Sequence, residues 1–388
     1  NEIMKILIIS IPSVHAIRWI ENLKEAGHEL FWFDVLNRGN IGVSTELTQI
    51  VNWKKRKLPY IKGEHFLRKK IPSLYYNIQS LLEITIKEKL EEIILNIKPD
   101  VVHSFEMQSC SYPILNTMQK LPKLKWIYSC WGSDLYYYKN FKNHNKKIKE
   151  VLKRINFLHT DCLRDYRIAK ELGFNGDHLG VIPGGGGFKL LEFKNLKIPI
   201  NDRNVILVKG YEHKFGRAIN VLKALSLLSK EIVDYKIIVF GAHQKVIDFI
   251  TENKLNFQVF DRNGLSHNEL IELMGKAKIY IGNSISDGMP NTLLEAIIMN
   301  AFPIQSNPGN VTSEIIKNEV NGLLINKPED ISDVKSQIEK ALLFDKERRL
   351  NGMANINTEI ANKLLDYSVN QKKILDLYNN VELKIKTN

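Results

Sequence analysis

The residues best suited to do chemistry gather just ahead of an amphipathic stretch in the second half of the chain. Between Leu293 and Ala301, apolar residues recur at helical spacing, which predicts a helix with one buried side. Directly before this stripe the chain reads Asp287–Gly288–Met289–Pro290–Asn291–Thr292, and Glu295 falls off the stripe. The pattern therefore predicts a buried helix whose first turns carry polar groups toward a ligand.

The start of this helix is suited to a diphosphate. Pro290 at the first helical position, with Asp287 and Gly288 before it, is typical of a well-formed helix start. The amide groups of the three residues that follow Pro290 have no partner inside the helix and carry the positive end of its dipole. A helix start of this kind binds phosphate oxygens readily.

Two carboxylates flank the predicted phosphate site. Glu295 lies one turn after Asn291, roughly 6 Å further along the same face, where it would accept hydrogen bonds from a ribose diol. Asp287 on the loop side would accept from sugar hydroxyls, and Gly288 lets a ligand approach the backbone without meeting a Cβ. The alternative from the residues alone is that Asp287 only caps the helix and Glu295 is solvated.

Alternating strands and helices must position these groups. Short apolar strands such as 4–10 and 100–105 alternate with helical stretches up to the glycine run 184–187, after which a second such series begins. This pattern predicts an α/β protein with two doubly wound Rossmann-like domains facing each other across a cleft. We expect an N-terminal domain over residues 1–183 and a C-terminal domain over 184–388, with a last helix, 360–388, that packs back on the first domain. Ligands of such sheets bind at the carboxyl ends of the strands.

The chain resembles the family 4 retaining glycosyltransferases of GT-B fold. That family is marked by Glu-x7-Glu in the setting found here at Asp287 and Glu295, and the likeness extends through "GHEL", "PDVVHS", "VIPGGGG" and "NGLLI". The resemblance implies that Asp287 contacts the donor sugar and Glu295 the ribose of a sugar nucleotide. Asp287 is one methylene shorter than the usual glutamate, which bears on the identity of the sugar.

The resemblance also implies a basic pair in the loop after the first strand of the second domain. The usual pattern, G-R-x4-K-G, reads here "VKGYEHKFGRAINVL", with Tyr211 and Gly216 where the basic residues would stand. We expect Arg217 first and Lys209 second to neutralise the diphosphate, because a guanidinium can bind two phosphate oxygens at once. The alternative is that both are ordinary surface cations.

Candidates for the sugar and acceptor side follow strands of the N-terminal half. In "CWGSDLYYY", Trp131 replaces the histidine that the family often places near the reacting sugar, and Ser133 and Asp134 follow it. Asp134 is expected to orient a hydroxyl or to offset positive charge in the transition state, or else to cap the next helix. His103 and Glu106 end a neighbouring strand, as catalytic groups or as structural ones.

Two loops complete the predicted cleft. His15 and Arg18 lie in and after the first strand-to-helix loop, where the family commonly has glycines, and would supply side-chain contacts instead. Gly185 and Gly186 stand where the chain enters the second domain and would serve as hinge and as backbone lining.

The reaction implied is transfer of a hexosyl or related group from a nucleotide diphosphate sugar to a hydroxyl, with retention. UDP is the expected nucleotide and GDP the alternative. No DxD pair sits in a suitable loop, so we expect no metal and no other cofactor, with the protein supplying the cations. The acceptor is expected to be a glycan or lipid-linked glycan in bacterial surface polysaccharide synthesis.

Charge points to an anionic partner. The net charge is +12, and residues 54–70 and 139–154 contain eight and seven basic residues, each with a single acidic one. These clusters suit an anionic membrane surface, and the alternative is a solvated lysine-rich face. No apolar run is long enough to span a bilayer, and Cys110, Cys130 and Cys162 form no CxxC pair, so a cytoplasmic protein with reduced core thiols is expected, peripheral at the inner membrane face.

Two other functions stay open from the sequence. A non-hydrolysing sugar-nucleotide epimerase shares the two-domain architecture, but no acid/base set for it can be assembled in the N-terminal half. A non-catalytic scaffold or nucleic-acid-binding protein would fit the basicity, yet the basic clusters lack interleaved aromatic residues or a recognisable reading module, so no nucleic-acid partner is expected.

Overall fold

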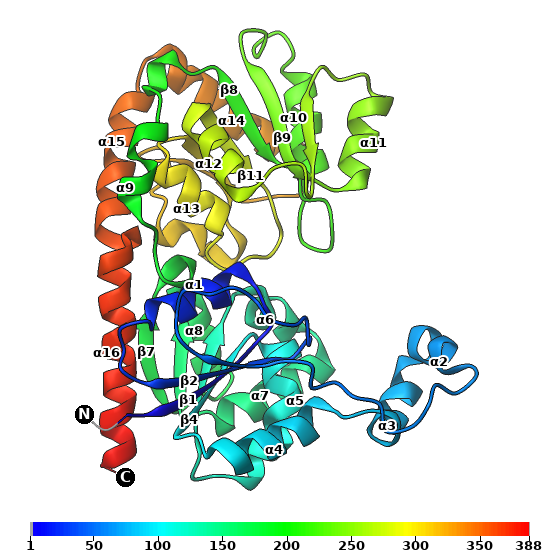
Figure 1. Cartoon of the computed structure of the whole chain (residues 1–388). Helices are drawn as coiled ribbons and strands as arrows, with labels where there is room; N and C mark the ends of the chain where they lie inside the picture. The colour runs from blue at the N-terminus through cyan, green and yellow to red at the C-terminus, as the bar shows by residue number, and fades with distance from the viewer. Residues whose placement is uncertain (1–2, 388) are drawn as a thin grey trace. The chain divides into compact units, whose positions relative to one another are not determined.

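The computed structural model describes residues 3–387, so the outermost residues of the two predicted domains, 1–2 and 388, lie outside it. The chain divides into two compact units (Figure 1). Unit 1 comprises residues up to Thr160, then Tyr166–Gly180 and the chain from Lys373 onward. Unit 2 comprises Asp161–Asp165 and Val181–Lys372.

Unit 1 is built on a seven-stranded sheet in the order β3-β2-β1-β4-β5-β6-β7. Its strands are β1 (Lys5–Ser10), β2 (Glu29–Asp34), β3 (Thr48–Ile50), β4 (Val101–Phe105), β5 (Lys125–Cys130), β6 (Phe157–Thr160) and β7 (Asp177–Val181). The helices are α1 (Val14–Asn22), α2 (Glu64–Lys70), α3 (Pro72–Leu82), α4 (Ile86–Ile97), α5 (Tyr112–Lys120), α6 (Ser133–Tyr136), α7 (Lys142–Arg154) and α8 (Leu163–Glu171), with most of α16 (Tyr367–Lys386). The strand pairs from β3 to β6 are parallel.

Unit 2 repeats this plan with six parallel strands in the order β10-β9-β8-β11-β12-β13. They are β8 (Val205–Lys209), β9 (Lys236–Ala242), β10 (Gln258–Asp261), β11 (Ala277–Gly282), β12 (Phe302–Ser306) and β13 (Leu323–Ile325). The helices are α9 (Leu190–Phe193), α10 (Ala218–Leu227), α11 (Gln244–Glu252), α12 (His267–Lys276), α13 (Asn291–Ile298), α14 (Ile331–Lys346) and α15 (Leu350–Ile360).

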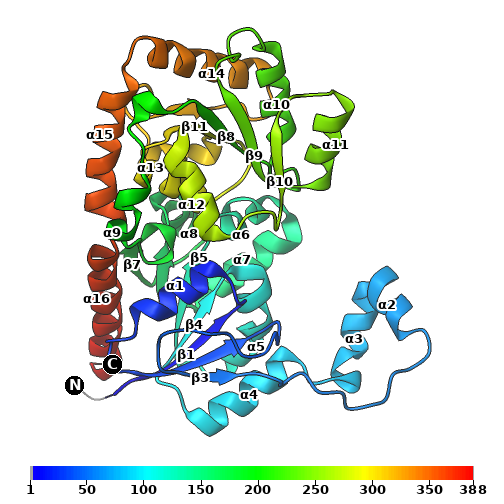
Figure 2. The ribbon, with the colours of Figure 1, turned by 45° about the horizontal axis from the view of Figure 1, so that its top comes forward.

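The predicted doubly wound α/β fold is confirmed in each unit. Strand order reverses at β1/β4 in unit 1 and at β8/β11 in unit 2, and all four strands are almost wholly buried. Helices cover the sheet of each unit (Figure 2). A doubly wound sheet binds its ligand beyond the carboxyl ends of the strands at such a reversal. The two places to search are therefore the loops that follow β1 and β4 and those that follow β8 and β11.

The sequence pattern also predicts helices over 76–95, over 312–319 and from Ile17 to near Gly27, and the structure differs from each of these expectations. The expected helix over 76–95 is broken after Leu82, because Thr85 and Glu88 form a capping box that begins α4. The expected helix over 312–319 is only one tight turn, Thr312–Glu314. The helix expected from Ile17 begins earlier, at Val14, because Ser13 caps its start. It ends at Asn22.

The cysteines and the helix lengths agree with the sequence reading as far as the structure describes the chain. All three thiols are free and buried. Within residues 3–387, no helix combines the length and the apolar character needed to cross a bilayer.

Candidate functional site

The turn from β11 into α13 carries the carboxylate of Asp287 before the helix, and Glu295 lies within the helix. The helix begins at Asn291 with Pro290 as its N-cap, whereas Pro290 was expected to be the first helical residue. The Pro290 carbonyl accepts the amides of Leu293 and Leu294 at 3.0 and 3.2 Å. Of the three amides that the sequence offered to a diphosphate, the Leu293 amide is therefore used inside the helix. The Gly288 amide donates to Asp287 Oδ1 at 3.0 Å.

Asp287 lies at the mouth of this turn. Burial raises the pKa of its carboxyl, while the positive charge of Lys209 and the Gly288 amide act in the opposite direction. Lys209 is the last residue of β8, and Asp287 follows β11, the neighbouring strand at the reversal. The two strands thus bring together two residues that were both predicted to contact the sugar nucleotide. The predicted roles of Asp287 and Lys209 toward a sugar nucleotide stay predictions.

Glu295 is 4% exposed, on the first turns of α13. Its Oε1 lies 2.8 Å from His267 Nε2, and His267 is the first residue of α12. The solvated alternative for Glu295 is thereby wrong, because the carboxylate is buried and oriented by a partner. His267 lies 28 residues away in the chain, so spacing along the helix could not reveal this contact.

A cluster of cations surrounds Tyr211 and His213 in the loop after β8. Lys209 Nζ and the Arg262 guanidinium lie 4.5 and 4.2 Å from the Tyr211 ring centre, and His243 packs edge-on against His213. Partial desolvation, together with the charges of His243, Lys209, Arg262 and Arg217, lowers the pKa of His213 to about 4. This concentration of positive charge is what an anionic ligand requires. Sequence reasoning missed Arg262, which follows β10.

Arg217 is the N-cap of α10, and its guanidinium is engaged by protein groups. Its Nε donates to Glu329 at 2.9 Å and its NH1 to the Gly216 carbonyl at 2.8 Å. A diphosphate would have to draw this side chain away from Glu329, which is mostly exposed. Lys209, whose charge acts on Asp287, is therefore better placed than Arg217, the reverse of the expected order.

A short segment, Asp161–Asp165, holds the donor-side turn in place within unit 2. The Arg164 guanidinium donates to the carbonyls of Asp287 and Pro308 at 2.8 Å each, and it is paired with Asp165 at 2.8 Å. Asp161 accepts the amide of Met289 at 3.0 Å. The sequence placed this segment in the first domain, so its role was not foreseen.

The glycine run reaches the same turn. Gly184 to Gly187 all have positive φ, and a Cβ on Gly184 would meet Leu294 Cδ1 at 2.9 Å and Asn291 Oδ1 at 3.3 Å. A side chain at 184 would therefore disturb the start of α13. The expected lining role of Gly185 and Gly186 is untested, but this run does lie beside the predicted phosphate site.

In unit 1, the segment after β1 and the loop after β5 bring His15 and Trp131 together. Their ring centres are 5.3 Å apart, and Trp131 lies 6.1 Å from Phe105, the last residue of β4. Both rings are only partly buried, so they form a surface at the carboxyl edge of the sheet. Arg18 is on α1 one turn beyond His15 and is also half-buried, and Ser133 opens α6.

Asp134 is drawn into the protein. Its carboxylate accepts the amides of Met107 and Trp131 at 3.0 Å each and the Tyr128 hydroxyl at 2.6 Å. With 5% of its surface exposed, it joins the ends of β4 and β5. This geometry favours the structural alternative over the catalytic role.

His103 is fully buried and both of its ring nitrogens are engaged. Nδ1 lies 2.6 Å from the Tyr378 hydroxyl and Nε2 lies 2.7 Å from Ser129 Oγ. Burial first, and His159 second, hold the pKa of His103 well below its usual range. A neutral, enclosed imidazole that links β4 to α16 again favours the structural alternative.

Glu106 differs from Asp134 and His103 because its backbone has a positive φ. Its φ is +72°, and its carboxylate caps the π-helical turn Met107–Ser111 through the amides of Gln108 and Ser109. Burial raises the pKa of this carboxyl. The expected contact of Glu106 with an acceptor stays a prediction.

One group within residues 3–387 has donor atoms close enough to hold a metal: Asp161, Cys162 and Asp165. Arg164 already pairs with Asp165, and Asp161 accepts the Met289 amide, so the group is used in holding the turn. The expectation that no metal is needed stays a prediction.

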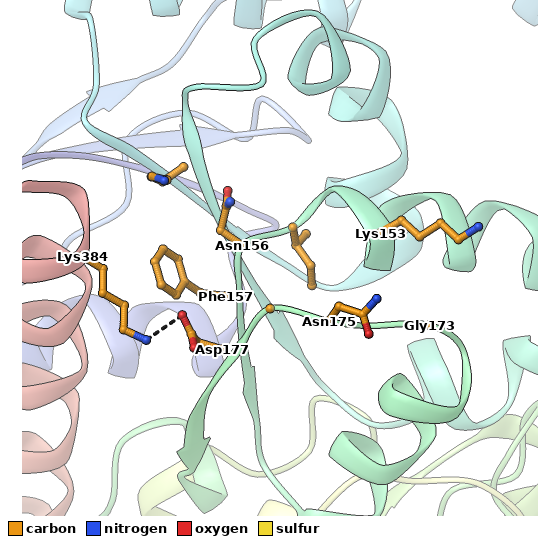
Figure 3. Close-up of a pocket in the computed structure, with 10 residues that line it drawn as sticks. Lys153, Asn156, Phe157, Gly173, Asn175, Asp177 and Lys384 are labelled. Carbon is orange, nitrogen blue, oxygen red and sulfur yellow. Dashed lines mark ion pairs between the residues drawn. The ribbon is translucent and has the colours of Figure 1, made fainter. Parts of the chain in front are cut away.

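A half-open cavity lies at the other edge of the unit 1 sheet. It has a volume of about 330 Å³, and Lys125, Phe157 and Asp177, each at the amino end of a strand, line it (Figure 3). Lys384 of α16 reaches it and pairs with Asp177 at 2.6 Å. A doubly wound sheet binds at its carboxyl edge, so this cavity is not the predicted site.

Comparisons with known proteins fit this geometry. Residues 190–355 match the family model for glycosyl transferases group 1, and residues 5–164 match that for glycosyl transferase 4-like domains. The chain belongs to these glycosyltransferases. The resemblance to family 4-like glycosyltransferases is thus confirmed, and the GT-B architecture of two Rossmann-like domains with it, whereas retention stays a prediction.

Solved structures share the fold of this glycosyltransferase at low identity. A glycosyltransferase from Rickettsia africae is 17% identical with a TM-score of 0.64, covering 98% of this chain and 99% of that one. Sucrose-phosphate synthase from Thermosynechococcus elongatus is 14% identical with a TM-score of 0.72, covering 99% and 100%. Anabaena HepE in complex with UDP is 11% identical with a TM-score of 0.69, covering 97% and 100%. No curated protein sequence matches the chain.

Proposed function

We propose that this glycosyltransferase moves a hexosyl or related group from a nucleotide diphosphate sugar to a hydroxyl of a glycan or lipid-linked acceptor, with retention. The observation that carries the proposal is Glu295: a carboxylate 4% exposed, one turn inside a helix whose start follows a strand at the sheet reversal. A ribose diol at that carboxylate places the diphosphate at the helix start.

The donor would be held by unit 2. The beginning of α13 and the ammonium of Lys209 would receive the charge that develops on the leaving diphosphate, and Arg262 adds a second cation nearby. Asp287 would accept hydroxyls of the transferred sugar. Because these cations belong to the protein, the proposal needs no metal.

UDP is the proposed nucleotide, with GDP as the alternative. Anabaena HepE was crystallised with UDP and with UDP-glucose, and the pneumococcal O-GlcNAc transferase GtfA was crystallised with UDP and GlcNAc. Their likeness to this chain supports the fold, and the donor panel described below tests the choice of UDP.

Retention would come from attack on the face that the diphosphate leaves, with the carboxylates of Asp287 and Glu295 accepting hydroxyls of the donor and forming no bond to the anomeric carbon. The acceptor oxygen forms its bond to the anomeric carbon as the bond to the diphosphate oxygen breaks, and the acceptor proton passes to the leaving diphosphate. Unit 1 would supply the acceptor contacts, with His15 and Trp131 as its exposed aromatic pair. A surface glycan made at a cytoplasmic membrane face is the proposed product.

The test is a panel of UDP-, GDP- and dTDP-sugars incubated with the purified protein. Slow hydrolysis of one donor, lost in Glu295→Ala, supports the proposal. Inversion at C2 of the sugar would replace it with the epimerase alternative. Retention of RNA without any donor turnover would replace it with the nucleic-acid-binding one.

A further inference from the structure

Exposed apolar side chains are concentrated in one part of unit 1. Within residues 3–387, 22 large apolar side chains are exposed, and eight of them fall in the 24 residues from 58 to 81. They include Tyr60 at 80%, Tyr76 at 68%, Leu81 at 64% and Phe66 at 59% exposed. An exposed apolar surface of this density marks an interaction site.

The two helices of this segment are set apart from the strands of unit 1 in both ribbon views (Figures 1 and 2). Helix α3 turns its Tyr75 and Leu82 inward, whereas Leu74 and Leu81 lie on the outer side at helical spacing. Its sequence, PSLYYNIQSLL, contains no charged residue. Helix α3 therefore presents an uncharged apolar stripe to the outside.

The cations of the segment divide into two groups. Arg56 makes a two-pronged pair with Glu64, Lys57 pairs with Glu88 at 2.5 Å, and Lys54 with Glu83 at 3.3 Å. The Lys57–Glu88 pair joins the segment to α4, and the other two pairs hold the segment to its own helices α2 and α3. By contrast, four exposed lysines form no ion pair with any residue that the structure describes: Lys55, Lys62, Lys69 and Lys70.

The second basic cluster of the sequence lacks this combination. Helix α7 turns Ile148, Val151 and Leu152 into the core and leaves lysines outside, so its outer face is charged without being apolar. Of the two basic clusters read from the sequence, the segment 54–82 is the one that offers exposed apolar groups beside lysines without an ion pair among the described residues. We call it the basic arm.

We propose that the basic arm docks this glycosyltransferase onto an anionic membrane surface. Phe66, Leu74 and Leu81 would enter the boundary between headgroups and acyl chains, and Tyr60 and Tyr76 would lie at headgroup depth. Lys62, Lys69 and Lys70 would lie among the lipid phosphates. Charge complementarity favours an anionic lipid surface over an apolar protein partner, because the unpaired charge of the arm is entirely positive. The proposal concerns the partner of the proposed transferase, yet vesicle binding needs neither donor nor acceptor.

The first experiment is co-sedimentation of the full chain with vesicles of phosphatidylcholine alone or mixed with phosphatidylglycerol. We expect binding only to the mixed vesicles, weakened by salt. Neutralising Lys62, Lys69 and Lys70 to Gln should lower the affinity roughly a hundredfold, because each cation near such a surface contributes about fivefold.

A matched control removes the same charge from exposed lysines of unit 2, with the triple change Lys223→Gln, Lys230→Gln and Lys245→Gln. This variant should keep at least a tenth of the wild-type affinity, because only long-range attraction is reduced. Equal loss in both triple variants would overturn the role of the arm and leave net charge as the cause.

A second experiment distinguishes insertion from adsorption. All three native thiols are buried, so a bimane dye attached to Phe66→Cys reports on the arm alone. Its emission should shift to the blue on mixed vesicles, while the dye on Val233→Cys, an exposed position of unit 2, should not respond.

Three outcomes would overturn the proposal. One is absence of binding to mixed vesicles, and another is an unchanged dye spectrum while the protein is bound. The third is a dimer in solution that Phe66→Ser dissociates, with no vesicle binding, which would assign the arm to a second copy of the chain. None of these outcomes bears on donor turnover, so failure here and failure of the proposed function are distinguishable.

Discussion

His267 Nε2 lies 2.8 Å from Glu295 Oε1, and this contact joins the first residue of α12 to the first turns of α13. Glu295 is buried, whereas about half of the His267 side chain is exposed. The histidine therefore lies on the solvent side of the carboxylate, where a ribose would approach. His267 orients the Glu295 carboxylate, and the ribose of the donor would bind the same carboxylate.

Replacing Glu295 with Ala should weaken UDP-sugar binding about tenfold to a hundredfold, because hydrogen bonds to a charged group contribute about 1.5–3 kcal/mol. Titration calorimetry of the full chain measures this loss. Unchanged affinity would show that the nucleotide binds elsewhere.

His267→Ala removes a positioning contact and leaves Glu295 in place. We expect the donor KM to rise about threefold to tenfold with little change in kcat, because losing a contact that positions the carboxylate costs less than losing the carboxylate itself. His267→Asn should restore part of the loss. A fall in kcat with unchanged KM would instead assign His267 to the chemical step.

The buried pair of Arg164 and Asp165 should make Arg164→Met costly. Their side chains are 7% and 0% exposed, and the change would leave a buried carboxylate unpaired as well as freeing the carbonyls of Asp287 and Pro308. We expect a loss of about 3–5 kcal/mol in the free energy of unfolding, measured by urea denaturation.

Two variants control for this. Removing the exposed pair through Lys335→Met should cost less than about 1 kcal/mol. The double change Arg164→Met with Asp165→Leu should recover part of the stability, since no charge is then left buried. A double variant as unstable as the single one would mean that the carbonyl contacts, and not the charge, carry the effect.

The sequence was sufficient for the fold and for the start of α13, because both follow from local patterns. Strand-helix alternation predicts doubly wound sheets, and the Asp-Gly and Pro signals place the turn before Asn291. Glu295 was predicted from its spacing to Asn291 together with the family resemblance. What the sequence could not supply are partners distant in the chain, such as His267, Arg262 and Arg164.

Burial was the second limit of the sequence. The sequence pattern puts His103 and Asp134 near the carboxyl ends of strands, which made them candidates for catalysis, but in the structure His103 is the middle residue of β4 and Asp134 lies in α6. Each is enclosed by hydrogen-bond partners that come from separate elements, Tyr378 in the first case and Tyr128 in the second. Spacing along one strand carries no information about such partners.

Tyr378→Phe tests whether His103 is structural. The Tyr378 hydroxyl accepts from Trp19 Nε1 at 3.0 Å and bonds His103 Nδ1, so its loss leaves two buried polar groups without that partner. We expect a loss of about 1–3 kcal/mol in stability by urea denaturation, with kcat of the folded protein unchanged. The exposed Tyr76→Phe should change neither value. A kcat that falls while stability holds would return His103 to the chemical step.

The low pKa of His213 predicts how donor affinity depends on pH. In the free protein this pKa is about 4, so the ring is neutral at pH 7. A bound diphosphate would offset the cations that help to lower the pKa of His213, and it would therefore raise this pKa. At pH values below the raised pKa, the complex would bind more protons than the free protein. Affinity for a UDP-sugar should therefore increase as pH falls from 7 to 5, by at most about tenfold per unit for a single proton.

A UDP-sugar is the right probe for this measurement, because its diphosphate is a diester and does not itself titrate in this range. His213→Gln should make the affinity independent of pH between 7 and 5, whereas His65→Gln, an exposed histidine of the basic arm, should keep the wild-type slope. Calorimetry in two buffers of different ionisation enthalpy measures the proton uptake directly. Proton uptake that persists in His213→Gln would assign the titration to another group and remove the diphosphate from this cation cluster.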